Sequence, residues 1–166
     1  MDDVQRAYDR RSAEYAELLG SMDAVHPADR ALVDYWSGFI TGRVLDVGCG
    51  PGHWTGYLHQ RGLAIGGLDL SPRSVDHARA AFPHLKFDVG SLDAIPAASG
   101  ALDGVLAWYS LIHLTPGRVP EALSDFARVL RPGGRLLLGF FEGPEVAAFE
   151  HAVVTAYSWP VAALSQ

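Results

Sequence analysis

Apolar residues recur at helical spacing in the first forty positions. Residues 3–19 place five of them on roughly one helical face: Val4, Tyr8, Tyr15, Leu18 and Leu19. This pattern predicts an amphipathic helix that ends at Gly20 and Ser21. A second helix is expected over residues 29–37, with Leu32, Val33 and Trp36 as its apolar stripe. Residues 1–40 are therefore expected to form an N-terminal helical cap.

Beyond residue 40 the pattern changes to short apolar runs that alternate with helical segments. Strands are expected at residues 44–47, 64–68, 85–89, 104–108 and 135–141. Helices are expected at residues 54–61, from Ser71-Pro72 to Phe82, and at 123–130. Such alternation implies right-handed crossovers and a parallel sheet that helices cover on both faces. The prediction is a doubly wound α/β fold with its core at residues 41–141.

The pattern weakens after Phe141. Residues 145–158 are expected to be helical, and residues 159–164 to open a further helix. Five strands can be identified in the sequence, and no internal repeat or low-complexity segment interrupts them.

Length, charge and cysteine usage narrow the class of protein. The 166 residues fit a single domain, 49% of them are hydrophobic, and the formal net charge is −6. The chain has no run of basic residues, which argues against a nucleic-acid partner. A single cysteine, Cys49, excludes an internal disulfide and suits a reducing cytosol, so a cytoplasmic location is expected.

Targeting and membrane signals are also missing from the sequence pattern. The polar, acidic start of the chain does not have the form of a signal peptide. The apolar run at residues 136–141 is too short to cross a bilayer, so no membrane partner is expected.

The glycine-rich stretch after the first expected strand is the main chemical signal. Gly48, Gly50 and Gly52 follow that strand, and the next strand ends in Asp69. Glycines allow backbone N–H groups to approach a ligand closely, and an acid at the next strand tip can accept hydrogen bonds from a ribose. An adenosine-containing cofactor is therefore expected. The spacing differs from the dinucleotide fingerprint, because His53 stands where that pattern has its third glycine.

The series Asp46-x-Gly48-x-Gly50-x-Gly52 instead resembles the first motif of the class I methyltransferases that use S-adenosyl-L-methionine (SAM). Four further segments resemble that family in the same order: Asp69 after the second strand, residues 87–92, residues 102–110, and residues 130–134. Residues 54–56, 108–113 and 157–160 look like a bacterial subgroup of small-molecule methyltransferases. The resemblance implies a Rossmann-like fold, SAM as cofactor and S-adenosyl-L-homocysteine (SAH) as product.

The resemblance also implies a set of cofactor-binding positions. They are Tyr8, Tyr15, Asp46, Gly48, Cys49, Gly50, His53, Trp54, Asp69, Leu70, Ser71, Gly90, Ser91, Leu92, Trp108 and Tyr109. Most family members have Asp at the position of Ser91, and a serine hydroxyl can accept the same hydrogen bond more weakly.

Several of these residues have a second interpretation. Asp46 either satisfies loop amides or approaches the sulfonium of SAM. Tyr8 and Tyr15 either pack an amphipathic helix or cover the cofactor, and both roles are compatible. Cys49 fills a tight turn rather than acting as a nucleophile, and Trp54 suits helix packing as well as the cofactor.

Candidate chemistry for the methyl acceptor centres on the tip of the fourth strand. Trp108 and Tyr109 are expected to form an aromatic rim, and His113 is either structural or a general base. The acceptor pocket is expected to include Tyr15, Phe141 and residues 157–159 as well. The histidines lack metal-ligand spacing, so no metal is expected. The Asn/Asp-Pro-Pro-Tyr motif of amino-directed nucleic-acid methyltransferases is absent after the fourth strand.

The expected activity is methyl transfer from SAM to an oxygen or nitrogen atom of a small-molecule acceptor. Two alternatives remain open: a non-catalytic protein that binds SAM or SAH, and an NAD-dependent oxidoreductase, which the glycine spacing disfavours. Family members usually add two C-terminal strands that this sequence does not show. We therefore expect one of three cases: a fragment, a natural truncation, or a homodimer in which a second copy completes the sheet.

Overall fold

The computed structural model describes residues 2–151 and 154–160. The helices are α1 (Asp2–Leu19), α2 (Pro27–Ser37), α3 (His53–Gln60), α4 (Pro72–Ala81) and α5 (Val119–Val129), with short 3-10 turns η1 (Met22–Ala24), η2 (Leu111–His113) and η3 (Pro116–Arg118). The strands are β1 (Arg43–Val47), β2 (Ala64–Asp69), β3 (Phe87–Val89), β4 (Leu102–Trp108), β5 (Leu130–Gly139), β6 (Phe141–Glu142), β7 (Ala147–Phe149) and β8 (Ala156–Trp159).

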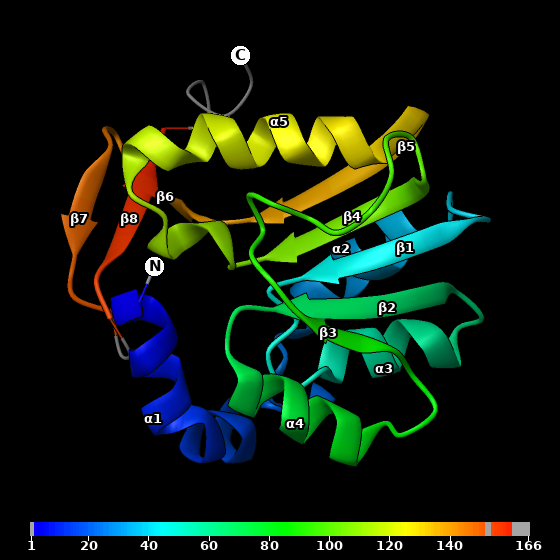
Figure 1. Cartoon of the computed structure of the whole chain (residues 1–166), viewed down its shortest axis with the longest axis horizontal. Coiled ribbons are helices and arrows are strands. Elements are labelled where there is room, and N and C mark those ends of the chain that lie inside the picture. Colours follow the sequence, from blue (N-terminus) through cyan, green and yellow to red (C-terminus); the bar gives the residue numbers. More distant parts are fainter. Residues whose placement is uncertain (1, 152–153, 161–166) are drawn as a thin grey trace.

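The core of the molecule is a five-stranded parallel sheet in the order β3-β2-β1-β4-β5. The chain moves outward from β1 to β3, then returns to the other side of β1 for β4 and β5. This order is that of a Rossmann-like doubly wound fold, so the predicted fold class is confirmed. In Figure 1 the carboxyl ends of these strands face α1 and a second, smaller sheet.

Helices bury both faces of the parallel sheet. On one face, Val44 and Leu106 lie in a cluster with Val33 and Trp36 of α2 and Leu58 of α3. Phe87, which shares this face by register, packs against Val75 and Ala78 of α4. On the opposite face, the largest cluster joins the sheet to α5 through these residues: Val47, Leu68, Val105, Ala122, Phe126 and Val129. Burial on both faces explains why the strands are continuously apolar rather than alternating.

The segment after β5 forms a small three-stranded sheet in the order β6-β8-β7. The helix predicted over residues 145–158 is wrong, because β7 and β8 pair there in antiparallel register from Ala147 opposite Ser158 to Phe149 opposite Ala156. Both Ala156 and Trp159 are buried, and Trp159 packs in the main core, which stabilises the extended backbone and outweighs the local helical pattern. Trp159 belongs to β8, and the remainder of the helix expected at 159–164 lies mostly outside the described residues.

The helix α1 lies across α4 at the carboxyl end of the sheet (Figure 1). Ser71 begins α4 as its N-cap, as the sequence predicts, by accepting a hydrogen bond from the backbone N–H of Ser74. The Ser71 hydroxyl also donates to the carboxylate of Asp9 over 2.6 Å. One residue therefore starts a helix and fastens α1 next to the glycine loop.

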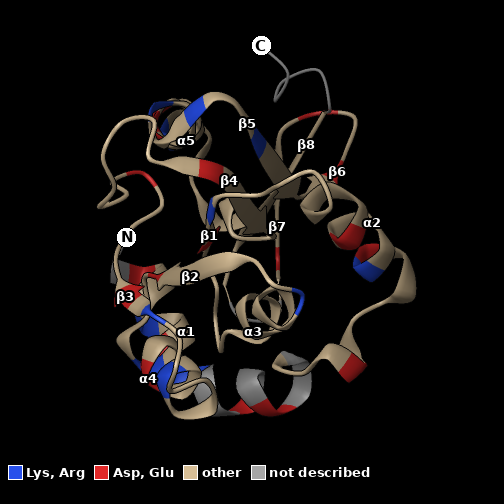
Figure 2. Cartoon of the chain, turned by 90° about the vertical axis from the view of Figure 1, so that its right-hand side faces the viewer, with Lys and Arg blue, Asp and Glu red and all other residues tan. Residues whose placement is uncertain are grey.

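Acidic and basic side chains are interspersed on the outer helices. Figure 2 shows both signs next to one another on α2, α4 and α5. None of the helices in the described ranges is long and apolar enough to cross a membrane.

Candidate functional site

The glycine loop after β1 and the tip of β4 meet where the strand order reverses. Gly48 has a φ of 76°, a left-handed conformation that favours glycine. A Cβ added to Gly48 would lie 2.2 Å from the Cβ of Ser110, which follows β4. The close approach of these two strand ends therefore requires glycine at position 48, and it creates the crevice in which ligands bind in such sheets.

Asp69 stands at the end of β2 and closes over this loop. One carboxylate oxygen accepts the N–H of Gly50 at 2.8 Å, and the other accepts the N–H of Ser71 at 2.9 Å. Burial raises the pKa of Asp69, while these two amide donors act in the opposite direction. A carboxylate has about four acceptor positions, so each oxygen retains a lone pair for a further donor.

Asp46 lies in the strand before the loop and is almost fully buried. It accepts a hydrogen bond of 2.7 Å from the hydroxyl of Thr55 on α3. Burial raises the pKa of Asp46 to about 7, and the negative charge of Asp69 adds to the shift. The Asp46 carboxyl is therefore poised between its two protonation states near neutral pH.

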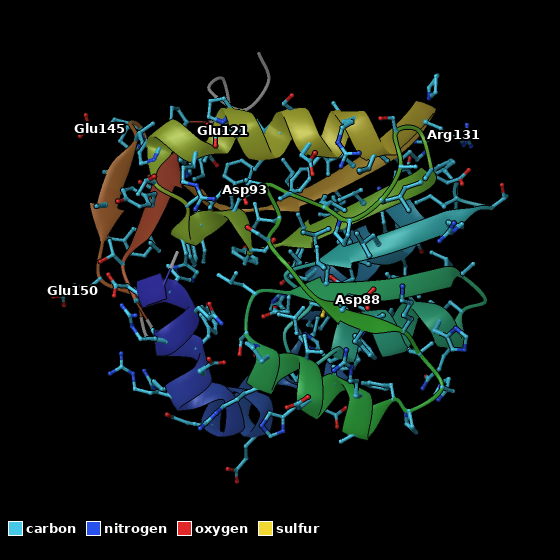
Figure 3. All side chains as sticks on the ribbon, in the orientation of Figure 1. Asp88, Asp93, Glu121, Arg131, Glu145 and Glu150 are labelled. Atoms are coloured by element: carbon cyan, nitrogen blue, oxygen red, sulfur yellow. The ribbon has the colours of Figure 1, made fainter. Side chains whose placement is uncertain are left out.

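A cavity of about 330 Å³ opens over the tips of β2 and β3, and we call it the strand-tip cavity. Its wall includes Asp69, Leu70, Ser71, Gly90, Ser91, Leu92, Ser110, His113 and Tyr157. The Ser91 hydroxyl donates to Asp93, whose side chain is 7% exposed and forms an ion pair with Arg118. Figure 3 shows Asp93 among the side chains beneath α5, in contrast to Glu145 and Glu150 at the outer edge.

His113 is held by hydrogen bonds at both ring nitrogens. Nδ1 lies 3.0 Å from the carbonyl oxygen of Thr155, which can only accept, so Nδ1 carries the proton. Nε2 of the neutral ring then accepts from the Tyr8 hydroxyl at 2.7 Å. Burial lowers the pKa of His113, with the nearby ring of His151 acting in the same direction. His113 therefore connects α1 to the segment before β8.

A second cavity of about 460 Å³ lies on the other side of the glycine loop, and we call it the aromatic cavity. Eight rings line it: Tyr8, His26, His53, Trp54, Trp108, Tyr109, Phe141 and His151. Burial lowers the pKa of His53 to about 4 and also lowers the pKa of His151, so both rings are neutral at pH 7. Asp46 and Cys49 contribute to the same wall, and burial raises the pKa of the Cys49 thiol, which keeps it protonated.

The two cavities adjoin one another. The residues that line both are Tyr8, Gly48, Gly50, Trp108 and Tyr109. Tyr109 has a φ of 54°, the one positive φ of a non-glycine residue in the described ranges. The tip of β4 therefore turns sharply, and its aromatic side chain stands at the junction of the cavities.

The structure brings most of the predicted site residues together. Of the cofactor positions expected from the sequence, all but Tyr15 line one or both cavities. Tyr15 belongs to α1, but its side chain lies outside the part of the chain that the structure describes. In the expected acceptor pocket, Phe141 lines the aromatic cavity and Tyr157 the strand-tip cavity, whereas Trp159 is buried in the main core and lines neither.

Some residues of the site were missed from the sequence. His151 lies within residues 145–158, which the sequence pattern predicts as helix, and its position in the cavity depends on β7 and β8. Asp93 lies two residues after Ser91, and an acid so close to the expected adenine segment is the signal that identifies it. Ser110 reaches the site because it packs against Gly48.

Buried polar atoms without a partner occur in the walls of both cavities. Ser110 Oγ, His53 Nδ1 and His151 Nδ1 have no hydrogen-bond partner among the described residues. Unsatisfied buried groups are rare and commonly indicate a place where a ligand or water binds.

Comparisons with known proteins agree with this geometry. The family model of the methyltransferase domain matches residues 44–134, more than half of the chain. A malonyl-[acyl-carrier protein] O-methyltransferase from Salmonella typhimurium is 34% identical over 131 residues, which are 79% of this chain and 50% of that protein. A demethylmenaquinone methyltransferase from Beutenbergia cavernae is 34% identical over 149 residues, or 90% of this chain and 59% of that protein. The chain thus spans about half the length of these relatives.

A solved structure shares the fold. The [4+2]-cyclase SpnF has a TM-score of 0.79 at 23% identity, covering 98% of this chain and 68% of that one. The strand order, the glycine loop at the switch point and the match over residues 44–134 lead to one conclusion: the chain belongs to the class I SAM-dependent methyltransferases.

Proposed function

We propose that this protein transfers the methyl group of SAM to an oxygen or nitrogen atom of a small-molecule acceptor. The observation that carries the proposal is the pair of adjoining cavities that share Tyr8, Gly48, Gly50, Trp108 and Tyr109. A transferase for two substrates needs two binding spaces whose reacting ends meet. The strand-tip cavity would hold the adenosine part of SAM, and the aromatic cavity would hold the acceptor.

The residues of the strand-tip cavity fit an adenosine group. Asp69 has lone pairs left for ribose hydroxyls after accepting its two amide bonds. The Ser91 hydroxyl gives its proton to Asp93, so its oxygen has the acceptor character that an adenine amino group requires. Gly48 and Gly50 leave the loop without side chains next to the cavity, which permits close contact with the methionine part.

When bound, SAM supplies an electrophilic methyl group on a positively charged sulfur. Asp46 lies in the wall of the adjoining cavity, and its ionised form provides a buried negative charge that favours a cation nearby. Trp108 and Tyr109 line both cavities, and aromatic rings there would attract a sulfonium and exclude water. The protein's main contribution is therefore positioning and dehydration of the reacting groups.

His113 can receive a proton through Tyr8. The Tyr8 hydroxyl lines both cavities and donates to His113 Nε2. A proton that passes from an acceptor hydroxyl to the Tyr8 oxygen would release the Tyr8 proton to His113. Thr155 stabilises the resulting imidazolium through its carbonyl contact with Nδ1.

The names of the two relatives support methyl transfer, and one of them specifies oxygen as the atom methylated. They support the proposed reaction without identifying the acceptor of this chain.

Calorimetric titration of the whole chain with SAM, SAH and NAD⁺ tests the cofactor class. The proposal expects SAM and SAH to bind and NAD⁺ to bind weakly or not at all. Preference for NAD⁺ would instead favour an oxidoreductase. Binding of SAH without methyl transfer to any member of an acceptor panel would favour a non-catalytic binding protein.

The variant Asp69→Ala tests the ribose contact. Loss of hydrogen bonds to a charged acceptor should weaken SAH binding by about 1.5–3 kcal/mol. Asp88→Ala is the matched control, because Asp88 lies on the neighbouring strand, pairs with Lys86 and lines neither cavity (Figure 3). Equal SAH affinity in the Asp69→Ala variant and the unsubstituted protein would place the ribose elsewhere.

A further inference from the structure

Six of the eight rings in the wall of the aromatic cavity form a continuous series. Neighbouring ring centroids are 5.1–6.0 Å apart along the order His53, Trp54, Trp108, Tyr109, Phe141 and His151. These separations lie in the range in which aromatic rings attract one another through edges and faces. A planar aromatic molecule in the cavity could therefore pack against these rings in the same edge and face arrangements.

These rings come from four separate parts of the chain. His53 and Trp54 begin α3, Trp108 ends β4 and Tyr109 follows it, Phe141 belongs to β6, and His151 follows β7. The main sheet and the small sheet thus hold opposite parts of the wall. A cavity of about 460 Å³ is within the usual size of small-molecule sites, on the order of 300–1,000 Å³.

The charges around the aromatic cavity disfavour an anion. The charged side chains in its wall are Arg11, Glu14, Asp29 and Asp46. Arg11 donates two hydrogen bonds to Glu14, at 2.9 and 2.7 Å, so its positive charge is largely balanced. Asp29 and the ionised form of Asp46 remain, so the wall is negative on balance and disfavours a carboxylate or phosphate in the cavity.

The polar groups at the two ends of the ring series suit a hydroxyl. His53 and His151 each have a buried Nδ1 atom without a partner among the described residues. Rotation of an imidazole about χ2 exchanges Nδ1 with a carbon position, so either histidine can turn a nitrogen toward a bound molecule. A hydroxyl is both donor and acceptor, and it satisfies a neutral imidazole in either tautomer.

We propose that the aromatic cavity binds an uncharged, planar aromatic molecule that carries a hydroxyl group. The rings from Trp54 to Phe141 would hold its plane, and His53 or His151 would hydrogen-bond its hydroxyl. The inference rests on the proposed function, because it assigns this molecule as the methyl acceptor. The inference narrows the class of acceptor to neutral aromatic alcohols, and it excludes aliphatic alcohols and acids.

Three ligands of similar size test the inference on the unsubstituted chain: 2-naphthol, decahydro-2-naphthol and 2-naphthoate. Calorimetry in the presence of saturating SAH should show 2-naphthol binding about tenfold or more tighter than each of the other two. Equal affinity for the saturated alcohol would refute the role of the rings. Preference for 2-naphthoate, or undetectable binding of 2-naphthol, would also overturn the inference.

Two leucine variants locate the binding site. Phe141→Leu removes a ring that contacts both Tyr109 and His151. The variant should bind 2-naphthol with about five- to tenfold lower affinity. Phe39→Leu is the matched control, since Phe39 is 51% exposed just after α2 and lines neither cavity. The same loss in both variants would contradict the proposed location.

SAH affinity separates this inference from the proposed function. Both leucine variants should bind SAH as the unsubstituted protein does. If SAH binds but 2-naphthol does not, the inference fails and the proposed function stands. If SAH does not bind to the unsubstituted protein, the proposed function itself fails.

Discussion

The two cavities of this protein are built in opposite ways. The strand-tip cavity combines larger side chains with loop backbone and small polar groups at consecutive strand ends, such as Gly90-Ser91 and Asp69 with its two amide donors. The aromatic cavity is formed by large side chains from α3, β4, β6 and the segment after β7. Their common wall is the glycine loop and the tip of β4.

This difference separates two kinds of recognition. Backbone amides and a fixed carboxylate recognise a constant group, because their positions follow from the sheet itself. Side chains from distant segments can change singly without disturbing the sheet, so they determine what else is bound. We therefore expect perturbations of the loop to affect both cavities, and perturbations of single rings to affect one.

The largest effect should follow from a change at the shared loop. Gly48→Ala forces a left-handed alanine and brings its Cβ to 2.2 Å from the Cβ of Ser110. The free energy of unfolding should fall by about 2–5 kcal/mol, and binding in both cavities should be lost. Urea denaturation measures the first effect and calorimetry the second.

Gly62→Ala is the matched control for this prediction. Gly62 has a φ of 92°, but a Cβ there would meet no atom within 4 Å. The free energy of unfolding should fall by only about 1–2 kcal/mol, the cost of placing alanine in a left-handed conformation, and ligand binding should be unchanged. Equal losses of stability in the two variants would show that the contact with Ser110 is unimportant.

The pH dependence of stability should reveal two opposing groups in the aromatic cavity. Asp46 has a pKa of about 7 in the folded protein and an ordinary value of 3.8, so its contribution to stability falls as pH rises from about 4 to 7. His53 has a pKa of about 4 and an ordinary value of 6.5, so its contribution falls as pH drops through the same range. Asp46→Asn should therefore make stability rise more steeply with pH between 4 and 7.

Asp125→Asn serves as a control, because it should change the pH dependence of stability in the opposite direction to Asp46→Asn. Its hydrogen bond from Arg128 lowers the pKa of Asp125, so this carboxylate adds stability as pH rises and loses it in acid. Removal of the Asp125 carboxylate should make stability less dependent on pH in acid. Denaturation midpoints from about pH 2 to 8 measure both variants, because the lowered pKa of Asp125 places its effect below the ordinary value of 3.8, and a flatter profile for Asp46→Asn between about pH 4 and 7 would contradict the assignment.

A smaller effect is expected at the contact between α1 and η2. Tyr8→Phe removes the hydrogen bond to His113 Nε2 and should cost about 0.5–1.5 kcal/mol of stability. Hydrogen exchange should become faster in the first turns of α1, because this contact fastens the helix over both cavities. Tyr35→Phe, at a side chain that is 69% exposed on α2, should leave stability and exchange unchanged. Unchanged exchange in α1 of the Tyr8→Phe variant would refute this fastening role.

The contrast between the cavities also explains what could be predicted from the sequence. The parallel sheet, the cap at Ser71 and the carboxylate at Asp69 follow from local patterns within short stretches of chain. The apolar strands and glycine turns that generate the strand-tip cavity are contiguous in the sequence, so its position could be predicted together with the fold.

The aromatic cavity could be predicted only in part. Trp108, Tyr109 and Phe141 were expected near the acceptor because they lie at strand tips. His151 was missed, since its place depends on pairing between β7 and β8, where tertiary burial of Trp159 overrides a helical pattern. The mutual contact of Tyr8 and His113, which are 105 residues apart, likewise depends on how α1 crosses the sheet end.

The central claim is that the two cavities bind different partners. The most direct test measures the affinities of SAH and 2-naphthol in the unsubstituted protein, Asp69→Ala and Phe141→Leu. We predict that Asp69→Ala lowers the affinity for SAH alone and that Phe141→Leu lowers the affinity for 2-naphthol alone. The claim would be contradicted if one variant lost affinity for both ligands equally. It would also be contradicted if Asp69→Ala lost affinity for 2-naphthol and Phe141→Leu lost affinity for SAH.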